Sequence, residues 1–127
     1  MTDDRFVAIR VTMLPKDTNP LGTIFGGVIL SYIDLAAGIQ VAKHTHQTFV
    51  TKAMKEVVFV APVQLGDLVT FYTQTSRIGR TSITVHVEVE VERLGPHGNR
   101  ETVRVTEADV VFVTIDATGR PTPIVEQ

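Results

Sequence analysis

The fold is decided by one stretch of the sequence, Asn19-Pro20-Leu21-Gly22-Thr23-Ile24-Phe25-Gly26-Gly27-Val28-Ile29-Leu30-Ser31-Tyr32-Ile33-Asp34-Leu35-Ala36-Ala37-Gly38-Ile39. It opens with turn formers and becomes almost wholly apolar after the Gly26-Gly27 pair. We expect a helix over about residues 26–43, in which Asp34 is the one acid. The side chains three and four positions from Asp34 include no cation. Another element must supply its hydrogen bonds or charge, because an unpaired buried carboxylate is costly.

Two interpretations of this acid remain open. Asp34 is either a buried acid satisfied by a neighbouring backbone or a catalytic carboxylate beside a substrate cleft. The Gly26-Gly27 pair also has two interpretations. The missing side chains allow either close packing of the helix on a sheet or close approach of a substrate to the helix N-terminus.

The composition indicates a globular protein without disulfide or thiolate chemistry. The 127 residues are enough for one domain with its own core, so we expect a single domain over residues 1–127. Hydrophobic residues make up 43% and charged residues 20%, as in soluble proteins. The net charge of −2 gives no reason to expect nucleic acid or a membrane as partner. Without cysteine, thiol catalysis and thiolate metal sites are excluded. We expect neither a signal peptide nor a membrane span, and we expect a cytoplasmic protein.

The rest of the chain predicts five strands, over about residues 6–13, 49–60, 68–78, 82–92 and 101–115. The fourth has the clearest alternation, in which the apolar residues Ile83, Val85, Val87, Val89 and Val91 form one face. The fifth breaks phase at Glu107 and Asp109. Either a bulge near residues 106–108 or an interface that accepts the acids would explain this break.

These elements predict an α+β architecture. A helix of about 18 residues is about 27 Å long, and five strands at about 4.8 Å spacing form a sheet of similar width. We therefore expect one helix across one face of a curled antiparallel sheet, with the four later strands in a meander. Because so small a sheet has exposed edges, we expect edge pairing in a homodimer.

The motifs resemble those of hotdog-fold acyl-CoA thioesterases, in particular the bacterial cytosolic acyl-CoA hydrolases. The segments that carry the resemblance are Gly22-Thr23-Ile24-Phe25-Gly26-Gly27, Ser31-Tyr32-Ile33-Asp34, Phe59-Val60-Ala61-Pro62-Val63, Gly66-Asp67, Arg77-Ile78-Gly79-Arg80-Thr81-Ser82 and Glu88-Val89. The resemblance implies a hotdog fold, with one long central helix, and hydrolysis of acyl-CoA. It implies that Asp34 is the catalytic carboxylate and that the backbone near Gly26 and Gly27 polarises the thioester carbonyl. Thr23 stands where relatives often carry Asp or Asn. The resemblance implies that the residue at this position helps to position water or substrate.

The chemistry of the residues is consistent with this resemblance. Thioester hydrolysis needs a base or nucleophile, an oxyanion stabiliser and water. Asp34 can act either as the base that activates water or as the nucleophile. Amides at the positive end of the helix can stabilise the oxyanion. No serine-hydrolase elbow, Walker motif or dinucleotide fingerprint is present.

Coenzyme A would be part of the substrate, so we expect no cofactor and no metal. Arg77 and Arg80 flank a tight turn and are candidates for binding its phosphates, unless they are simply solvated. The backbone from Gly79 through Thr81 to Ser82 is a candidate for pairing with the pantetheine amides. The remaining candidates on the substrate side are Asn19, in the loop before the helix, and, more weakly, Lys52 and Lys55.

Two other functions remain open. One is a non-catalytic acyl-CoA binding or sensing module, although 127 residues leave no room for an output domain. The other is a hotdog dehydratase or hydratase, which pairs a His with a carboxylate. No His lies in residues 22–38, and His86 is on the polar face of a regular strand. The resemblance implies an assembly that ranges from a homodimer to a tetramer or hexamer.

Overall fold

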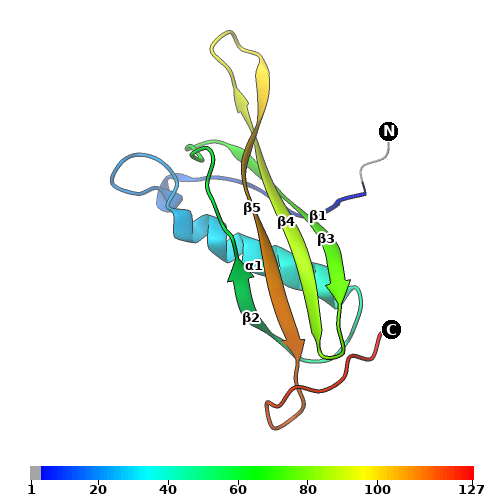
Figure 1. Ribbon diagram of the computed structural model, residues 1–127. Helices are drawn as coiled ribbons and strands as arrows, with labels where there is room; N and C mark the ends of the chain where they lie inside the picture. Colours follow the sequence, from blue (N-terminus) through cyan, green and yellow to red (C-terminus); the bar gives the residue numbers. More distant parts are fainter. Residues whose placement is uncertain (1–3) are drawn as a thin grey trace.

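In the computed structural model, which describes residues 4–127, one helix lies across one face of a five-stranded antiparallel sheet (Figure 1). The elements in chain order are β1 (Phe6–Thr12), the 3-10 helix η1 (Pro15–Asp17), α1 (Gly26–Ala42), β2 (Phe49–Lys55), β3 (Leu68–Ile78), β4 (Ser82–Leu94) and β5 (Arg100–Thr114). The strands are arranged in the order β1-β3-β4-β5-β2. The predicted α+β architecture is confirmed. No helix within residues 4–127 is long and apolar enough to cross a membrane.

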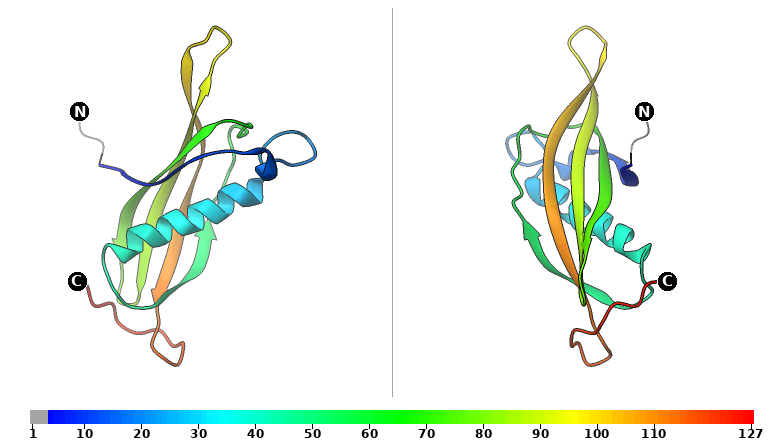
Figure 2. Two further views of the ribbon diagram at one scale, coloured as in Figure 1. Left: turned by 180° about the vertical axis from the view of Figure 1, so that it is seen from behind. Right: turned by 45° about the vertical axis from the view of Figure 1, so that its right-hand side comes forward.

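The core lies between α1 and the sheet face that α1 covers (Figure 2). From β4 it takes the five apolar residues of the predicted alternation, Ile83, Val85, Val87, Val89 and Val91, each at most 1% exposed. Ala36 and Ala37 of α1 are fully buried among them. These small side chains allow the helix backbone to come close to the sheet, so the middle of α1 has a fixed position over the strands.

The predicted four-strand meander is wrong for β2. Strands β3, β4 and β5 do follow one another as neighbours, but β2 pairs with β5 at the far edge of the sheet. The connection after β2 therefore passes β5 and β4 before β3 begins. Local sequence cannot reveal this order, because it depends on which strands pair over long distances.

The strand predicted over residues 49–60 is also too long. It ends at Lys55, because Glu56 adopts a left-handed backbone conformation with φ of 56°. The chain then runs along the edge of β5, where Val60 N–H donates to Val105 O at 2.8 Å. The hydroxyl of Thr106 donates to Val58 O at 2.7 Å. Residues 57–63 thus form a separate segment beside the N-terminal half of α1.

The phase break in β5 is a β-bulge, as one of the two explanations predicted. Val89 pairs with Thr106 but Glu90 pairs with Arg104, so Val105 is an extra residue. Val105 and Thr106 are consequently both buried. The bulge lies one residue before the predicted range, and beyond it the acids of β5 point away from the core.

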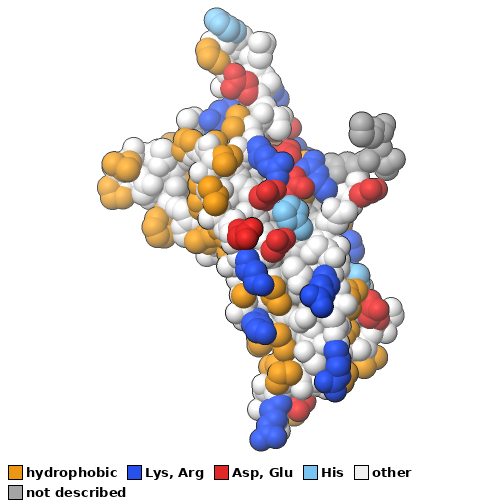
Figure 3. Space-filling view, in the orientation of Figure 1, with side chains coloured by type: hydrophobic (Ala, Val, Ile, Leu, Met, Phe, Trp, Pro, Cys, Tyr) orange, Lys and Arg blue, Asp and Glu red, His pale blue; other side chains and the backbone are white. Residues whose placement is uncertain are grey.

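The sheet face turned away from α1 is charged (Figure 3). His86 lies on this face, with Nδ1 2.8 Å from Asp109 Oδ1 and Nε2 3.4 Å from Glu107 Oε2. Hydrophobic side chains gather at the left of Figure 3, over the loop that enters α1 and the segment that follows β2. The molecule therefore has a polar outer sheet face and an apolar surface near the N-terminal end of its helix.

Candidate active site

Asp34 lies in the middle of α1 and is half-buried. The hydroxyl of Thr51, on β2, donates a hydrogen bond of 2.7 Å to Asp34 Oδ1. Within residues 4–127 this is the one hydrogen bond to the carboxylate, which has no cation or backbone amide as partner. One carboxylate oxygen is therefore oriented by the sheet edge, and the other is available to a water molecule or a substrate.

Sequence reasoning missed Thr51. It follows Asp34 by 17 residues, and only the placement of α1 over β2 brings the two together. A threonine in a strand is a common residue with no local signal of function. The structure thus adds a side chain that orients the candidate catalytic carboxylate.

The N-terminus of α1 presents two free amides. Phe25 occupies the N-cap position in an extended conformation, and its carbonyl accepts a hydrogen bond from Val28 N–H at 3.0 Å. Neither Gly26 N–H nor Gly27 N–H donates a hydrogen bond within the part of the chain that the structure describes. Unpaired amides at the positive end of a helix are suited to bind an anionic oxygen.

The two glycines face aromatic side chains and not the sheet. A Cβ atom on Gly26 would lie 3.9 Å from the ring of Phe59, an ordinary contact. A Cβ atom on Gly27 would lie 2.5 Å from Cε2 of Phe25, which would have to move. Close helix-to-sheet packing therefore does not account for either glycine. At Gly27 the absent side chain makes room for the Phe25 ring.

Asn19 and Thr23 hold the loop that leads into α1. Asn19 Oδ1 accepts hydrogen bonds from Leu21 N–H at 2.9 Å and Thr23 N–H at 3.2 Å. Asn19 Nδ2 donates to the Thr23 hydroxyl at 2.9 Å. Both side chains are thus near the start of the helix, and both are used to shape this loop.

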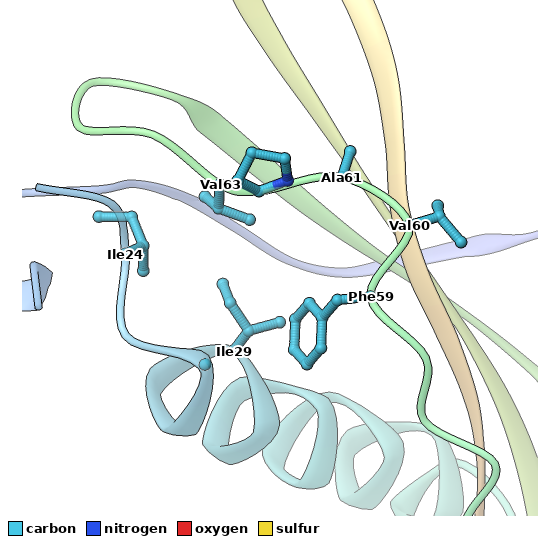
Figure 4. A pocket seen from close by; sticks show the side chains of 8 residues that line it. Ile24, Ile29, Phe59, Val60, Ala61 and Val63 are labelled. Carbon is cyan, nitrogen blue, oxygen red and sulfur yellow. The ribbon is translucent and has the colours of Figure 1, made fainter. Parts of the chain in front are cut away.

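An apolar pocket of about 340 Å³ opens beside the helix N-terminus (Figure 4). Its lining residues come from the end of the loop, the first turn of α1 and the segment after β2: Ile24, Gly26, Ile29, Phe59, Val60, Ala61, Pro62 and Val63. In Figure 4, Phe59 points toward Ile29 and Val60 points away. The volume falls in the range of about 300 to 1,000 Å³ of small-molecule sites. The pocket is suited to an apolar group next to the free amides.

Apart from Asn19, the predicted coenzyme-binding residues lie at the other end of α1. The turn between β3 and β4 places Arg77, Gly79, Arg80, Thr81 and Ser82 together. Ile124 N–H donates to Arg80 O at 2.9 Å, and Gly79 N–H donates to Ser82 O at 2.7 Å. Neither guanidinium has a partner among residues 4–127. Since the 17-residue helix is about 25 Å long, this turn and the free amides are far apart in one chain.

Comparison with known proteins identifies the family. Residues 21–95 match the thioesterase superfamily. The chain belongs to the thioesterase superfamily. This thioesterase is 32% identical over 118 residues to an acyl-CoA thioester hydrolase of Salmonella typhimurium, covering 93% of this chain and 89% of the relative.

Solved structures of thioesterases have the same fold. A hexameric hotdog fold thioesterase of Campylobacter jejuni superposes with a TM-score of 0.88 at 39% identity, covering 94% of this chain and 90% of that one. A hexameric broad-specificity acyl-coenzyme A thioesterase gives a TM-score of 0.88 at 34% identity, covering 98% and 84%. The resemblance and the hotdog fold expected from the sequence are confirmed.

Proposed function

We propose that this thioesterase hydrolyses acyl-CoA to a free acid and CoA. The observation that carries the proposal is the pair of free amides at Gly26 and Gly27, of which Gly26 lines an apolar pocket. A thioester carbonyl bound by these amides would place its acyl group in the pocket. The Salmonella relative and one of the solved structures, both named for activity on acyl-CoA, support the same substrate.

Asp34 supplies the base or the nucleophile. In the first route its carboxylate takes a proton from water, and the water oxygen adds to the carbonyl carbon. In the second it attacks the carbonyl itself, and water then hydrolyses the resulting anhydride. In both routes the carbon–sulfur bond breaks and a proton reaches the CoA thiolate. The negative oxygen that forms on the way accepts the two amide hydrogen bonds.

The active site needs two copies of the chain. Asp34 follows Gly26 by eight residues, so the two are about 12 Å apart along the helix axis. A base and oxyanion donors must both lie within about 3 Å of the reacting atoms. The short side chain of Asp34 does not close this gap. We therefore propose that the amides of one subunit act with Asp34 of another.

Surface features near Asp34 support this homodimer. Leu35 and Ile39 on α1 are 60% and 41% exposed, although both are large and apolar. Strand β2, which carries Thr51, forms an edge of the sheet. A symmetric pair that covers these residues would bury apolar surface and join two sheet edges. The solved hexamers named above fit a further assembly of such dimers.

The direct test of the proposed function is release of free CoA from a panel of acyl-CoA substrates. We expect turnover on at least one member without added metal or cofactor. Tight binding of acyl-CoA with no turnover on any member would contradict hydrolysis and favour an acyl-CoA sensing module.

We predict that replacing both Arg77 and Arg80 with Ala raises KM for acyl-CoA more than it lowers kcat. Phosphate binding is largely the same in the ground state and the transition state, so its loss affects mainly KM. Steady-state kinetics at low and high salt measure this, and the effect should shrink as salt screens the charges. An unchanged KM in the double variant would show that other residues bind the phosphates. Arg100→Ala, at the start of β5, serves as a matched control for the loss of an exposed cation.

We predict that Thr51→Val lowers kcat by about tenfold or more, because a hydrogen bond to a charged group contributes about 1.5–3 kcal/mol. Thr51→Ser retains the hydroxyl and should restore most of the activity. Single-turnover rates and melting curves of both variants separate orientation of Asp34 from general stability. Equal losses in the Val and Ser variants would contradict a role for the hydroxyl.

A further inference from the structure

A single extended segment separates two pockets. Residues 59–63 of the segment 57–63 line the pocket beside Gly26 on one side. On the other side lies a second pocket of about 520 Å³, lined by Glu56, Val58, Val60, Arg104, Thr106 and Glu107. Side chains of an extended chain alternate in direction. Phe59 accordingly points toward the helix, whereas Val60 points away (Figure 4).

Phe59 stands next to the candidate oxyanion amides. Its ring atoms Cε2 and Cζ lie 3.9 Å from the position that a Cβ atom on Gly26 would occupy. It is the one aromatic residue in the lining of this pocket. An acyl chain whose carbonyl is bound at Gly26 would therefore begin beside this ring.

The backbone is held in place on both sides of Phe59. Val58 O accepts the hydrogen bond of the Thr106 hydroxyl, and Val60 N–H donates to Val105 O at 2.8 Å. Both partners belong to the bulge of β5, which is part of the sheet. The backbone of Phe59 consequently cannot retreat from the pocket without loss of these two bonds, so its side chain starts from a fixed point in the pocket wall.

Phe59 is also far less buried than the core residues that line the pocket. Ile24, Ile29 and Val63 are at most 6% exposed and belong to the core. Phe59 is 41% exposed, so a change of its size costs the core little. The size of the pocket can therefore change at this position without disturbing the fold.

We propose that Phe59 sets the upper size limit of the acyl group that this thioesterase accepts. The proposal rests on the proposed hydrolysis of acyl-CoA and assigns a specificity role within that site. With the phenyl ring present, an acyl chain is confined between the ring and the core residues of the pocket. With the ring removed, the same pocket admits additional methylene groups.

The test is kcat/KM of wild type, Phe59→Ala and Phe59→Leu for straight-chain acyl-CoAs of increasing length. We expect the wild-type values to fall beyond a limiting length, the Ala variant to move this limit to longer chains, and the Leu variant to lie between them. Each methylene that reaches the freed space should raise kcat/KM about fourfold relative to wild type, since burying one is worth about 0.8 kcal/mol. Val58→Ala is the matched control, because Val58 lines only the second pocket.

The outcomes distinguish this proposal from the proposed function. Wild-type turnover with an unchanged chain-length profile in a folded Phe59→Ala protein would overturn the role of Phe59 alone. A shift of the same size in Val58→Ala would also overturn it, because loosening of the segment would then be the cause. Absence of turnover by the wild type on every chain length would remove the proposed function and the role of Phe59 with it.

Discussion

Asp34→Asn is expected to lower kcat by at least about a hundredfold, the lower end of what general-base catalysis contributes. The substitution preserves shape and volume but removes the charge and the basic lone pair. The amide oxygen of Asn can still accept the hydrogen bond that the Thr51 hydroxyl gives to Oδ1 at 2.7 Å. Because that bond can persist and the site is only half-buried, the fold and the binding of a non-hydrolysable acyl-CoA analogue should survive.

Measurement of kcat and melting temperature on the same preparation separates catalysis from stability. If Asp34 were purely structural, activity would be lost only to the extent that the protein unfolds. A well-folded Asp34→Asn protein with near wild-type turnover would end the catalytic assignment. Asp34→Ala provides a second variant, in which the Thr51 hydroxyl also loses its acceptor and stability should fall further.

Gly26→Pro is expected to lower kcat by about a hundredfold to a thousandfold, the usual loss on removal of one oxyanion donor. Proline removes the amide hydrogen at the first position of α1, where a helix tolerates it well. The preceding residue, Phe25, has φ of −61° and ψ of 127°, an extended conformation that is compatible with a following proline. The variant therefore removes the candidate donor with little disturbance of the helix.

Gly26→Ala is the matched control for this variant. It retains the amide, and its Cβ atom would lie at an ordinary contact distance of 3.9 Å from Phe59. Alanine should therefore keep most of the activity. Equal losses in the Pro and Ala variants, measured as kcat with saturating acyl-CoA, would indicate a steric cause and would contradict the role of the amide.

Regular patterns in the sequence predicted much of this fold. The alternation from Ile83 to Val91 correctly predicted a strand with one buried face. The apolar run after Gly26 correctly predicted the helix. Both predictions rest on patterns that are local in the sequence. The place of β2 beside β5 and the end of β2 at Glu56 were not predicted. Both depend on long-range pairing and on a backbone turn for which Glu is an unusual residue.

The sequence predicted some residues of the candidate site and missed others. Asp34 and the glycines were conspicuous because they interrupt an apolar helix. Thr51 was not, since it becomes a partner only through the placement of α1 over the sheet edge. Phe59 was assigned to a strand, whereas it belongs to the segment that bounds a pocket. The coenzyme-binding roles of Asn19 and the β3–β4 turn stay predictions.

The central claim is that each active site combines Asp34 of one subunit with the helix amides of another. Its most direct test is to mix the Asp34→Asn and Gly26→Pro proteins under conditions that exchange subunits, and to measure CoA release. A mixed dimer would contain one intact site and one site with both defects. Random mixing should therefore restore about a quarter of wild-type activity, although each variant alone is nearly inactive. Mixed dimers that form, as shown by a tag on one variant, but regain no activity would contradict the account.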